Sequence, residues 1–199
     1  MTIFHEDIPF YVNFDDNHCF QAALRMVIAH FESKELPWKE LEAMTGYEPK
    51  KWTWTIAGAL AMAKRGYGVV LHSLFGLARF ANNGEKYLFE YFSESTARSF
   101  MENCSDIKRA QEASEEVIGI VRKVQEKPLY KDLASYLSQK FLLICNMNSH
   151  TITGKLGFTG HSIVVYKADN ENAWLHDPGL PTRESDQGQK GRFYESLGI

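Results

Sequence analysis

The chain has 199 residues, the size of one ordinary domain, and this length allows a core that needs no disulfide or metal. Hydrophobic residues make up 44% and charged residues 24%, the balance of a globular protein rather than a disordered or fibrous one. The formal net charge is −3, and basic residues are scattered among acids, so nucleic acid is not an expected partner.

No apolar run is long enough for a membrane span, which needs about 20 residues. The first residues lack the basic start and apolar stretch of a signal peptide, so we expect a cytoplasmic protein with no membrane partner. The three cysteines, Cys19, Cys104 and Cys145, lie far apart and form no Cys-x-x-Cys pair. This spacing indicates free thiols.

Apolar residues recur with helical spacing from Phe20 to Phe31. The polar run Asp15-Asp16-Asn17 just before them offers N-cap candidates. A second apolar row widens the stripe beyond what a surface helix carries, so we expect a helix that is packed on more than one side. Cys19 falls in its first turn.

The middle of the chain also predicts helices. Short ones are expected from Pro37 to Gly46 and from Thr55 to Arg65, and residues 68–73 contain enough β-branched residues for a strand. Residues 84–138 predict about three more helices, with breaks near 104–106 and 127–128. We therefore expect a single domain over 1–199 with a helical insertion at about 84–138.

The C-terminal part predicts strands. Apolar runs at 141–146, 162–167 and 173–176 suit buried strands, and residues 168–172 between the last two have turn chemistry. Helices come first and strands mostly last. This order favours an α+β fold in which an N-terminal helical part packs on a C-terminal antiparallel sheet.

Cys19 is the candidate nucleophile. Unpaired backbone N–H groups and the macrodipole in the first turn of a helix stabilise a thiolate, and the same N–H groups can bind the oxyanion formed when sulfur attacks a carbonyl. The alternative is that Cys19 is a small core residue, since buried cysteines are common. Cys104 is expected at the surface and Cys145 in the core.

His161 is the candidate base, because it follows a glycine-rich loop at 154–160 and begins a predicted strand. The glycines, Gly160 included, leave room for a substrate to approach the imidazole. If the following turn is centred on Asp169, His161 lies directly opposite Asp177, and both side chains point to the same face of the sheet. A carboxylate there would orient and support the imidazole.

These residues resemble a known family. Residues 17–27, NHCFQAALRMV, are similar to the nucleophile helix of the bacteriocin-processing, double-glycine leader peptidases, and residues 160–166 with 175–178 are similar to the family's Gly-His and Asp-Pro block. The resemblance covers 13–29 and about 141–181. It implies a papain-like cysteine peptidase fold in which Cys19 is the nucleophile, His161 the general base and Asp177 the orienting acid.

The chain departs from this family at three positions. Asn13 stands where relatives often have a glutamine that binds the oxyanion, and it has the same amide on a side chain one methylene shorter. His18 and Phe20 flank Cys19 where the family has Asp and Gly. Many relatives are fused to a membrane transporter, so a stand-alone relative is the better match, and the double-glycine substrate preference is not carried over.

The resulting prediction is a thiol hydrolase or transferase that acts on a peptide or other amide without a cofactor. Substrate contacts are expected from Gly160, Trp54 and His18, although aromatic clusters such as the one around Trp54 more often pack a helix. The alternative function is a catalytically inactive module that binds a peptide or partner protein. A metal site is less favoured because it would need the triad geometry to be abandoned. No feature of the sequence indicates an oligomeric state.

Overall fold

The structure is a computed structural model that describes residues 3–5, 7–150, 158–179 and 181–189. It is a mixed α+β fold with eight helices and an antiparallel sheet in the described part of the chain, as predicted. Internal contacts divide the chain into a sheet unit, Met1–Trp38 with Pro128–Ile199, and a helical unit, Lys39–Lys127. The helical unit therefore begins well before the predicted insertion at residue 84 and ends before the last predicted helix.

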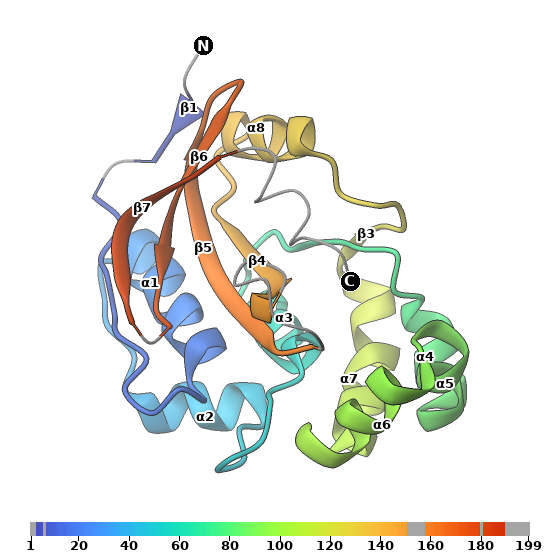
Figure 1. Ribbon diagram of the computed structural model, residues 1–199. Coiled ribbons are helices and arrows are strands. Elements are labelled where there is room, and N and C mark those ends of the chain that lie inside the picture. The colour runs from blue at the N-terminus through green and yellow to red at the C-terminus, as the bar shows by residue number, and fades with distance from the viewer. Residues whose placement is uncertain (1–2, 6, 151–157, 180, 190–199) are drawn as a thin grey trace. The chain divides into compact units, whose positions relative to one another are not determined.

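The sheet unit is organised around one long central strand. Its elements are β1 (Ile3–Phe4), α1 (Cys19–Glu32), α8 (Tyr130–Ser138), β4 (Leu143–Asn148), β5 (Gly160–Ala168), β6 (Asn172–Asp177) and β7 (Arg183–Gln189). β5 pairs antiparallel with β1, β4 and β6, and β6 pairs with β7 (Figure 1). The predictions of β4, β5 and β6 are confirmed. β7 was not predicted because its sequence, RESDQGQ, has no apolar alternation.

Helices cover both faces of β5. Ala23 and Met26 of α1 pack on Val164, whereas Leu133 of α8 packs in the cluster that contains Ile163 and Val165. Successive strand residues point to opposite faces, so these two clusters lie on opposite sides of the sheet. This explains why the middle of β5, residues 163–166, is an uninterrupted apolar run rather than an alternating one.

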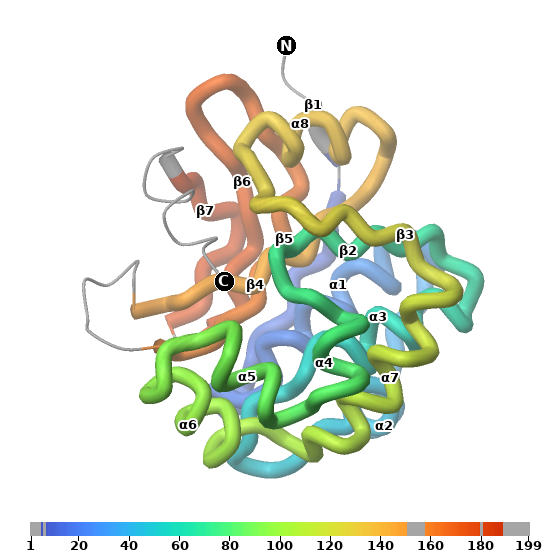
Figure 2. The backbone as a smooth tube through the Cα atoms, turned by 90° about the vertical axis from the view of Figure 1, so that its right-hand side faces the viewer, coloured from blue at the N-terminus to red at the C-terminus, as the bar shows by residue number. Residues whose placement is uncertain are grey.

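The helical unit has a core of its own. Its elements are α2 (Trp38–Thr45, which begins at the boundary), α3 (Thr55–Lys64), β2 (Val70–His72), α4 (Leu77–Asn83), α5 (Glu85–Tyr91), α6 (Glu94–Asn103), α7 (Ile107–Ile120) and β3 (Arg122–Val124). α7 packs against α3 and α4 (Figure 2), and Phe80, Leu88 and Val117 are fully buried between the helices. β2 and β3 pair in parallel, a pairing that the sequence did not predict. Within the described ranges, none of the helices combines the length and apolar character that crossing a membrane requires.

Candidate active site

The nucleophile candidate stands at the very start of α1. The helix begins at Cys19 with His18 as its N-cap residue, so the predicted first-turn position of the thiol is confirmed. The predicted cap residues are corrected, because Asp15 to Asn17 form a turn ahead of the helix instead. Cys19 is a free, partly exposed thiol. Backbone N–H groups in the first turn have no intrahelical partner and are available to a ligand at this end.

Asn13 lies directly behind this helix start and is fully buried. Its backbone N–H donates to the carbonyl oxygen of Pro178 at 3.0 Å, and its side-chain Oδ1 accepts from the backbone N–H of His18 at 2.9 Å. The carbonyl oxygen of the side-chain amide therefore already accepts a hydrogen bond. The donor end, Nδ2, is buried and has no hydrogen-bond partner among the residues that the structure describes. An unused buried donor is costly unless a ligand satisfies it.

His161 and Asp177 form a short hydrogen bond within the sheet unit. Nε2 of His161 donates to Oδ1 of Asp177 at 2.6 Å, and only 14% of the histidine and 19% of the aspartate side chain are exposed. The same oxygen accepts the backbone N–H of Gly179 at 2.8 Å. Because Nε2 is bonded to the carboxylate, Nδ1 is the ring nitrogen that is left for the Cys19 thiol, which also forms a hydrogen bond with this imidazole.

The electrostatics of the pair favour a charged imidazole. Burial lowers the pKa of His161, but the hydrogen bond to Asp177 and the hydrogen bond and charge of Cys19 outweigh it and raise that pKa from 6.5 to about 10. Burial raises the pKa of Asp177, and the bond and charge of His161, the Gly179 N–H and the charge of Arg183 together bring it below its ordinary value. At neutral pH these contributions favour the imidazolium form of His161, next to the Cys19 sulfur and the Asp177 carboxylate.

The register that joins His161 to Asp177 differs from the predicted one. Ala168 faces Ala173 across a turn closed by the Asp169 N–H and the Asn172 carbonyl, and a bulge beyond Val165 shifts the pairing so that Val164 faces His176. Continued toward the strand end, this register places Asp177 opposite residue 163, diagonal to His161 and on the same face. The predicted direct pairing was therefore wrong, and the predicted shared face was right. Diagonal neighbours lie about 7–8 Å apart, within reach of a long side chain.

Gly179 lies against the imidazole of His161, and the sequence reasoning missed it. A Cβ at this position would lie 2.8 Å from Cε1 of His161 and 2.9 Å from Oδ1 of Asp177, distances that no real side chain tolerates. The absent side chain lets the imidazole lean across the strand pair to reach the carboxylate. A glycine directly after Asp-Pro, where the strand ends, was the available signal.

The three residues predicted to contact substrate lie in different settings. His18 is 2% exposed, and its Nδ1 is bonded to Asp15. Gly160 begins β5, and a Cβ there would only touch the ring of Phe158 at an ordinary 3.6 Å. Trp54 packs in the core of the helical unit, where its indole N–H donates to the carbonyl of Ser105. Trp54 therefore packs a helical core, which was the alternative to the predicted substrate contact.

The other two cysteines are protonated thiols. Burial raises the pKa of Cys104 and of Cys145 to about 12 in each case. Cys145 lies in the core as predicted, but the prediction of a surface Cys104 is corrected, because this side chain packs against the core of the helical unit. Neither thiol has the local chemistry of a nucleophile.

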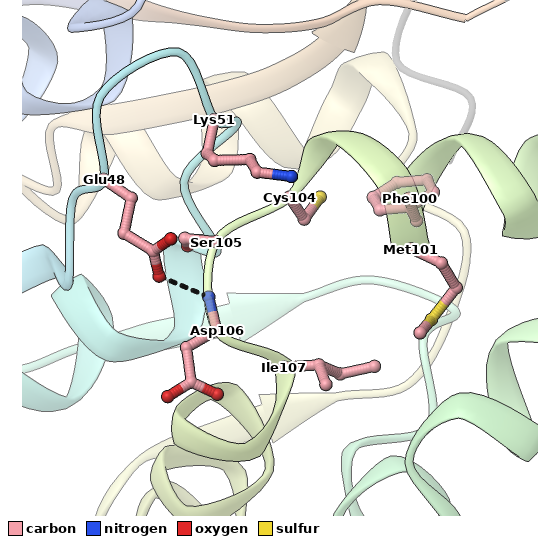
Figure 3. Close-up of a pocket in the computed structure, with 8 residues that line it drawn as sticks. All are labelled: Glu48, Lys51, Phe100, Met101, Cys104, Ser105, Asp106 and Ile107. Atoms are coloured by element: carbon pink, nitrogen blue, oxygen red, sulfur yellow. Dashed lines mark hydrogen bonds between the residues drawn. The ribbon is translucent and has the colours of Figure 1, made fainter.

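A cavity of about 470 Å³ lies beside Cys104 in the helical unit (Figure 3). Its lining residues are Glu48, Lys51, Phe100, Met101, Cys104, Ser105, Asp106 and Ile107. The charged side chains of its lining have partners within the protein: Glu48 accepts the Asp106 N–H, the Asp106 carboxylate caps α7, and Lys51 donates to the Glu102 carbonyl.

The chain matches no protein-family model, no curated protein and no solved structure. Among the described residues, no three His, Cys, Asp or Glu side chains are grouped as metal ligands would be.

Proposed function

We propose that Cys19, His161 and Asp177 are the catalytic centre of a thiol hydrolase or transferase that acts on a peptide or another amide. The observation that carries the proposal is the contact of one imidazole with both a carboxylate, at 2.6 Å, and a thiol at a helix N-terminus. A histidine held in this way keeps a proton beside the sulfur, which is the arrangement of a thiolate–imidazolium pair.

The acylation step follows from this pair. The Cys19 thiolate attacks the carbonyl carbon of the amide, the carbon–oxygen π bond opens, and a tetrahedral intermediate with a negative oxygen forms. Collapse of the intermediate breaks the carbon–nitrogen bond, and the His161 imidazolium gives its proton to the departing amine. The product amine leaves, and the acyl group remains on sulfur as a thioester.

Deacylation reverses the roles. Neutral His161 takes a proton from an incoming water or another acceptor nucleophile, which attacks the thioester carbonyl. The carbon–sulfur bond breaks, the acid or transfer product leaves, and sulfur departs as the thiolate beside the re-formed imidazolium. Asp177 holds the ring at Nε2 throughout, so that Nδ1 keeps facing the sulfur.

Asn13 supports the same reaction as an oxyanion donor. Its Nδ2 is the buried amide donor that has no described partner, and its orientation is set by the bond that His18 N–H makes to Oδ1. Together with the Cys19 N–H it would supply two donors for the negative oxygen of the tetrahedral intermediate. The side chain is shorter than the glutamine of the family that the sequence resembles, but the Asn13 backbone N–H is bonded to the carbonyl oxygen of Pro178, the residue after Asp177.

A papain-like fold is part of the proposal. The support is the order of parts: a buried helix that begins at the thiol, an antiparallel strand that begins beside the histidine, and a following strand that ends at the acid. Phe20, which replaces the family's glycine, is 5% exposed, so its ring is packed inward rather than standing free beside the sulfur. This placement favours a working centre over the alternative of an inactive binding module.

The test is the rate at which iodoacetamide alkylates Cys19 between pH 5 and 9, followed by peptide mass spectrometry. Rapid labelling well below the pH at which a free thiol ionises is expected, with a drop of at least tenfold in His161→Ala. Cys104→Ser is the matched control and should leave the rate unchanged, because the Cys104 thiol is protonated across this range. A rate that rises only near pH 8.5, as for an ordinary thiol, would refute the proposal.

A further inference from the structure

A second histidine–aspartate pair lies immediately before the nucleophile. Nδ1 of His18 donates to Oδ1 of Asp15 at 2.7 Å, and the histidine side chain is 3% exposed. The same carboxylate oxygen accepts the backbone N–H of Asn17 at 3.0 Å, and Asp16 between them has a positive φ of 64°. One oxygen thus closes the tight turn that leads into α1 and fixes the imidazole of the residue beside Cys19.

The ring of His18 is also held by aromatic contacts inside the sheet unit. It stacks on Phe14 with ring centroids 4.6 Å apart, and the edge of Trp38 approaches it at 5.6 Å. Phe14 and Trp38 contact each other at 5.1 Å, so the three rings form a closed cluster. Offset and edge-on aromatic contacts at these distances are favourable and leave the imidazole little freedom to turn.

The backbone of His18 connects this histidine–aspartate pair to the two proposed oxyanion donors. Its N–H donates to Oδ1 of Asn13, which engages the carbonyl end of that amide, while Nδ2 has no partner within the described part of the chain. The next residue along the chain is Cys19, whose N–H belongs to the first turn of α1. The position of His18 therefore sets both proposed oxyanion donors, the Asn13 amide on one side and the Cys19 N–H on the other.

We propose that Asp15 and His18 are positioning residues that hold these two oxyanion donors in place; this role rests on the proposed function. His18 acts through the backbone and through Asn13 rather than by contact with substrate, because its own side chain is buried and bonded. A supporting residue of this kind changes the geometry of donors that matter only when charge develops on the carbonyl oxygen.

The experiment compares two reactions of the same sulfur in the full chain. Alkylation by iodoacetamide displaces iodide and forms no oxyanion, whereas acylation by p-nitrophenyl acetate passes through a tetrahedral oxyanion. We expect His18→Ala and Asp15→Ala to lower the acylation rate about tenfold or more while the alkylation rate stays within about twofold of wild type. Asp15→Asn keeps an acceptor oxygen for both bonds and should restore most of the acylation rate.

Asp169→Ala is the matched control. Asp169 also closes a turn by accepting two backbone N–H groups, from Glu171 and Asn172, but it does so at the opposite end of β5 and β6 from His161. Neither reaction should change in this variant. An equal loss of alkylation and acylation in His18→Ala and Asp15→Ala, or no loss in either reaction, would overturn the positioning role.

The alkylation and acylation rates of the wild-type protein distinguish the positioning role of Asp15 and His18 from the thiol-hydrolase proposal on which it rests. Slow alkylation of wild-type Cys19 at low pH would overturn the thiol-hydrolase proposal and the positioning role with it. Rapid alkylation without any acylation by the ester would leave the reactive thiol standing and overturn the oxyanion site that Asp15 and His18 are inferred to support.

Discussion

His161 is the residue on whose charge state the proposed reaction depends. Its pKa is raised to about 10 because the bonds to Asp177 and Cys19 outweigh burial. The folded protein therefore binds this proton more tightly than the unfolded chain does. The resulting stabilisation is complete below the ordinary pKa of 6.5 and is lost as the pH rises through about 10.

This sign gives a prediction for Asp177→Asn. Removing the negative charge lowers the pKa of His161, so the part of the free energy of unfolding that declines between pH 6.5 and 10 should become smaller than in wild type. Urea denaturation at several pH values in this window measures both curves. Parallel curves for wild type and variant would contradict the coupling.

The absence of a side chain at Gly179 leaves the space that the His161 imidazole and the Asp177 carboxylate occupy. We expect Gly179→Ala to displace the imidazole, since its Cβ would lie 2.8 Å from Cε1 of His161, and to slow alkylation of Cys19 about 10- to 100-fold. Gly119→Ala in α7 is the control, because a Cβ there meets nothing within 4 Å and alanine is the better helix former. An unchanged alkylation rate in Gly179→Ala would show that the ring tolerates displacement.

At the scale of elements, α1 links the fold to the site. Its apolar face is packed on β5, while its first residue is the thiol. The helix pattern alone placed Cys19 in the first turn, since the apolar spacing locates the start to within a residue or two. The residue that caps the helix could not be derived in this way, because His18 occupies the N-cap without a side-chain cap bond and Asp15 is used in the preceding turn.

The other end of α1 offers a test of stability. Ser33 is the C-cap residue with φ 52° and ψ 32°, a left-handed conformation that a Cβ disfavours. Ser33→Gly should raise the free energy of unfolding by about 0.5–1 kcal/mol, and Ser33→Val should lower it. Thermal unfolding measures both. A lower melting temperature for Ser33→Gly would mean that the serine side chain contributes more than the backbone strain costs.

At the scale of the whole molecule, the chain forms two units, and the helical unit is continuous in sequence. Its buried core is drawn entirely from residues between Trp54 and Val121, and its small sheet pairs two of its own strands. We therefore expect a fragment of residues 39–127 to fold alone, with a helical circular dichroism spectrum and a cooperative thermal transition. A broad, non-cooperative melt would show that this core is insufficient without the rest of the chain.

The boundaries of the two units could not be predicted from the sequence. The predicted insertion at 84–138 followed the stretch rich in helix formers, but α2 and α3 have the same local pattern and are grouped with the later helices by contacts alone. α8 was predicted as part of the insertion, yet Leu133 and Leu137 pack on the sheet. Local periodicity shows that a helix has an apolar face and does not show which surface that face covers.

The sequence by itself determined the α+β class, the central strands and the thiol at the head of a helix, because these depend on spacing along the chain. It also placed His161 and Asp177 on one face. Side chains of a strand alternate between the two faces, so a shift of the register by two residues leaves both side chains on the face that was predicted. Only the tertiary structure decided the diagonal pairing, the need for Gly179 and the Nδ2 donor of Asn13 that has no partner among the described residues. Those features depend on a bulge and on contacts between distant segments, whose geometry no local pattern encodes.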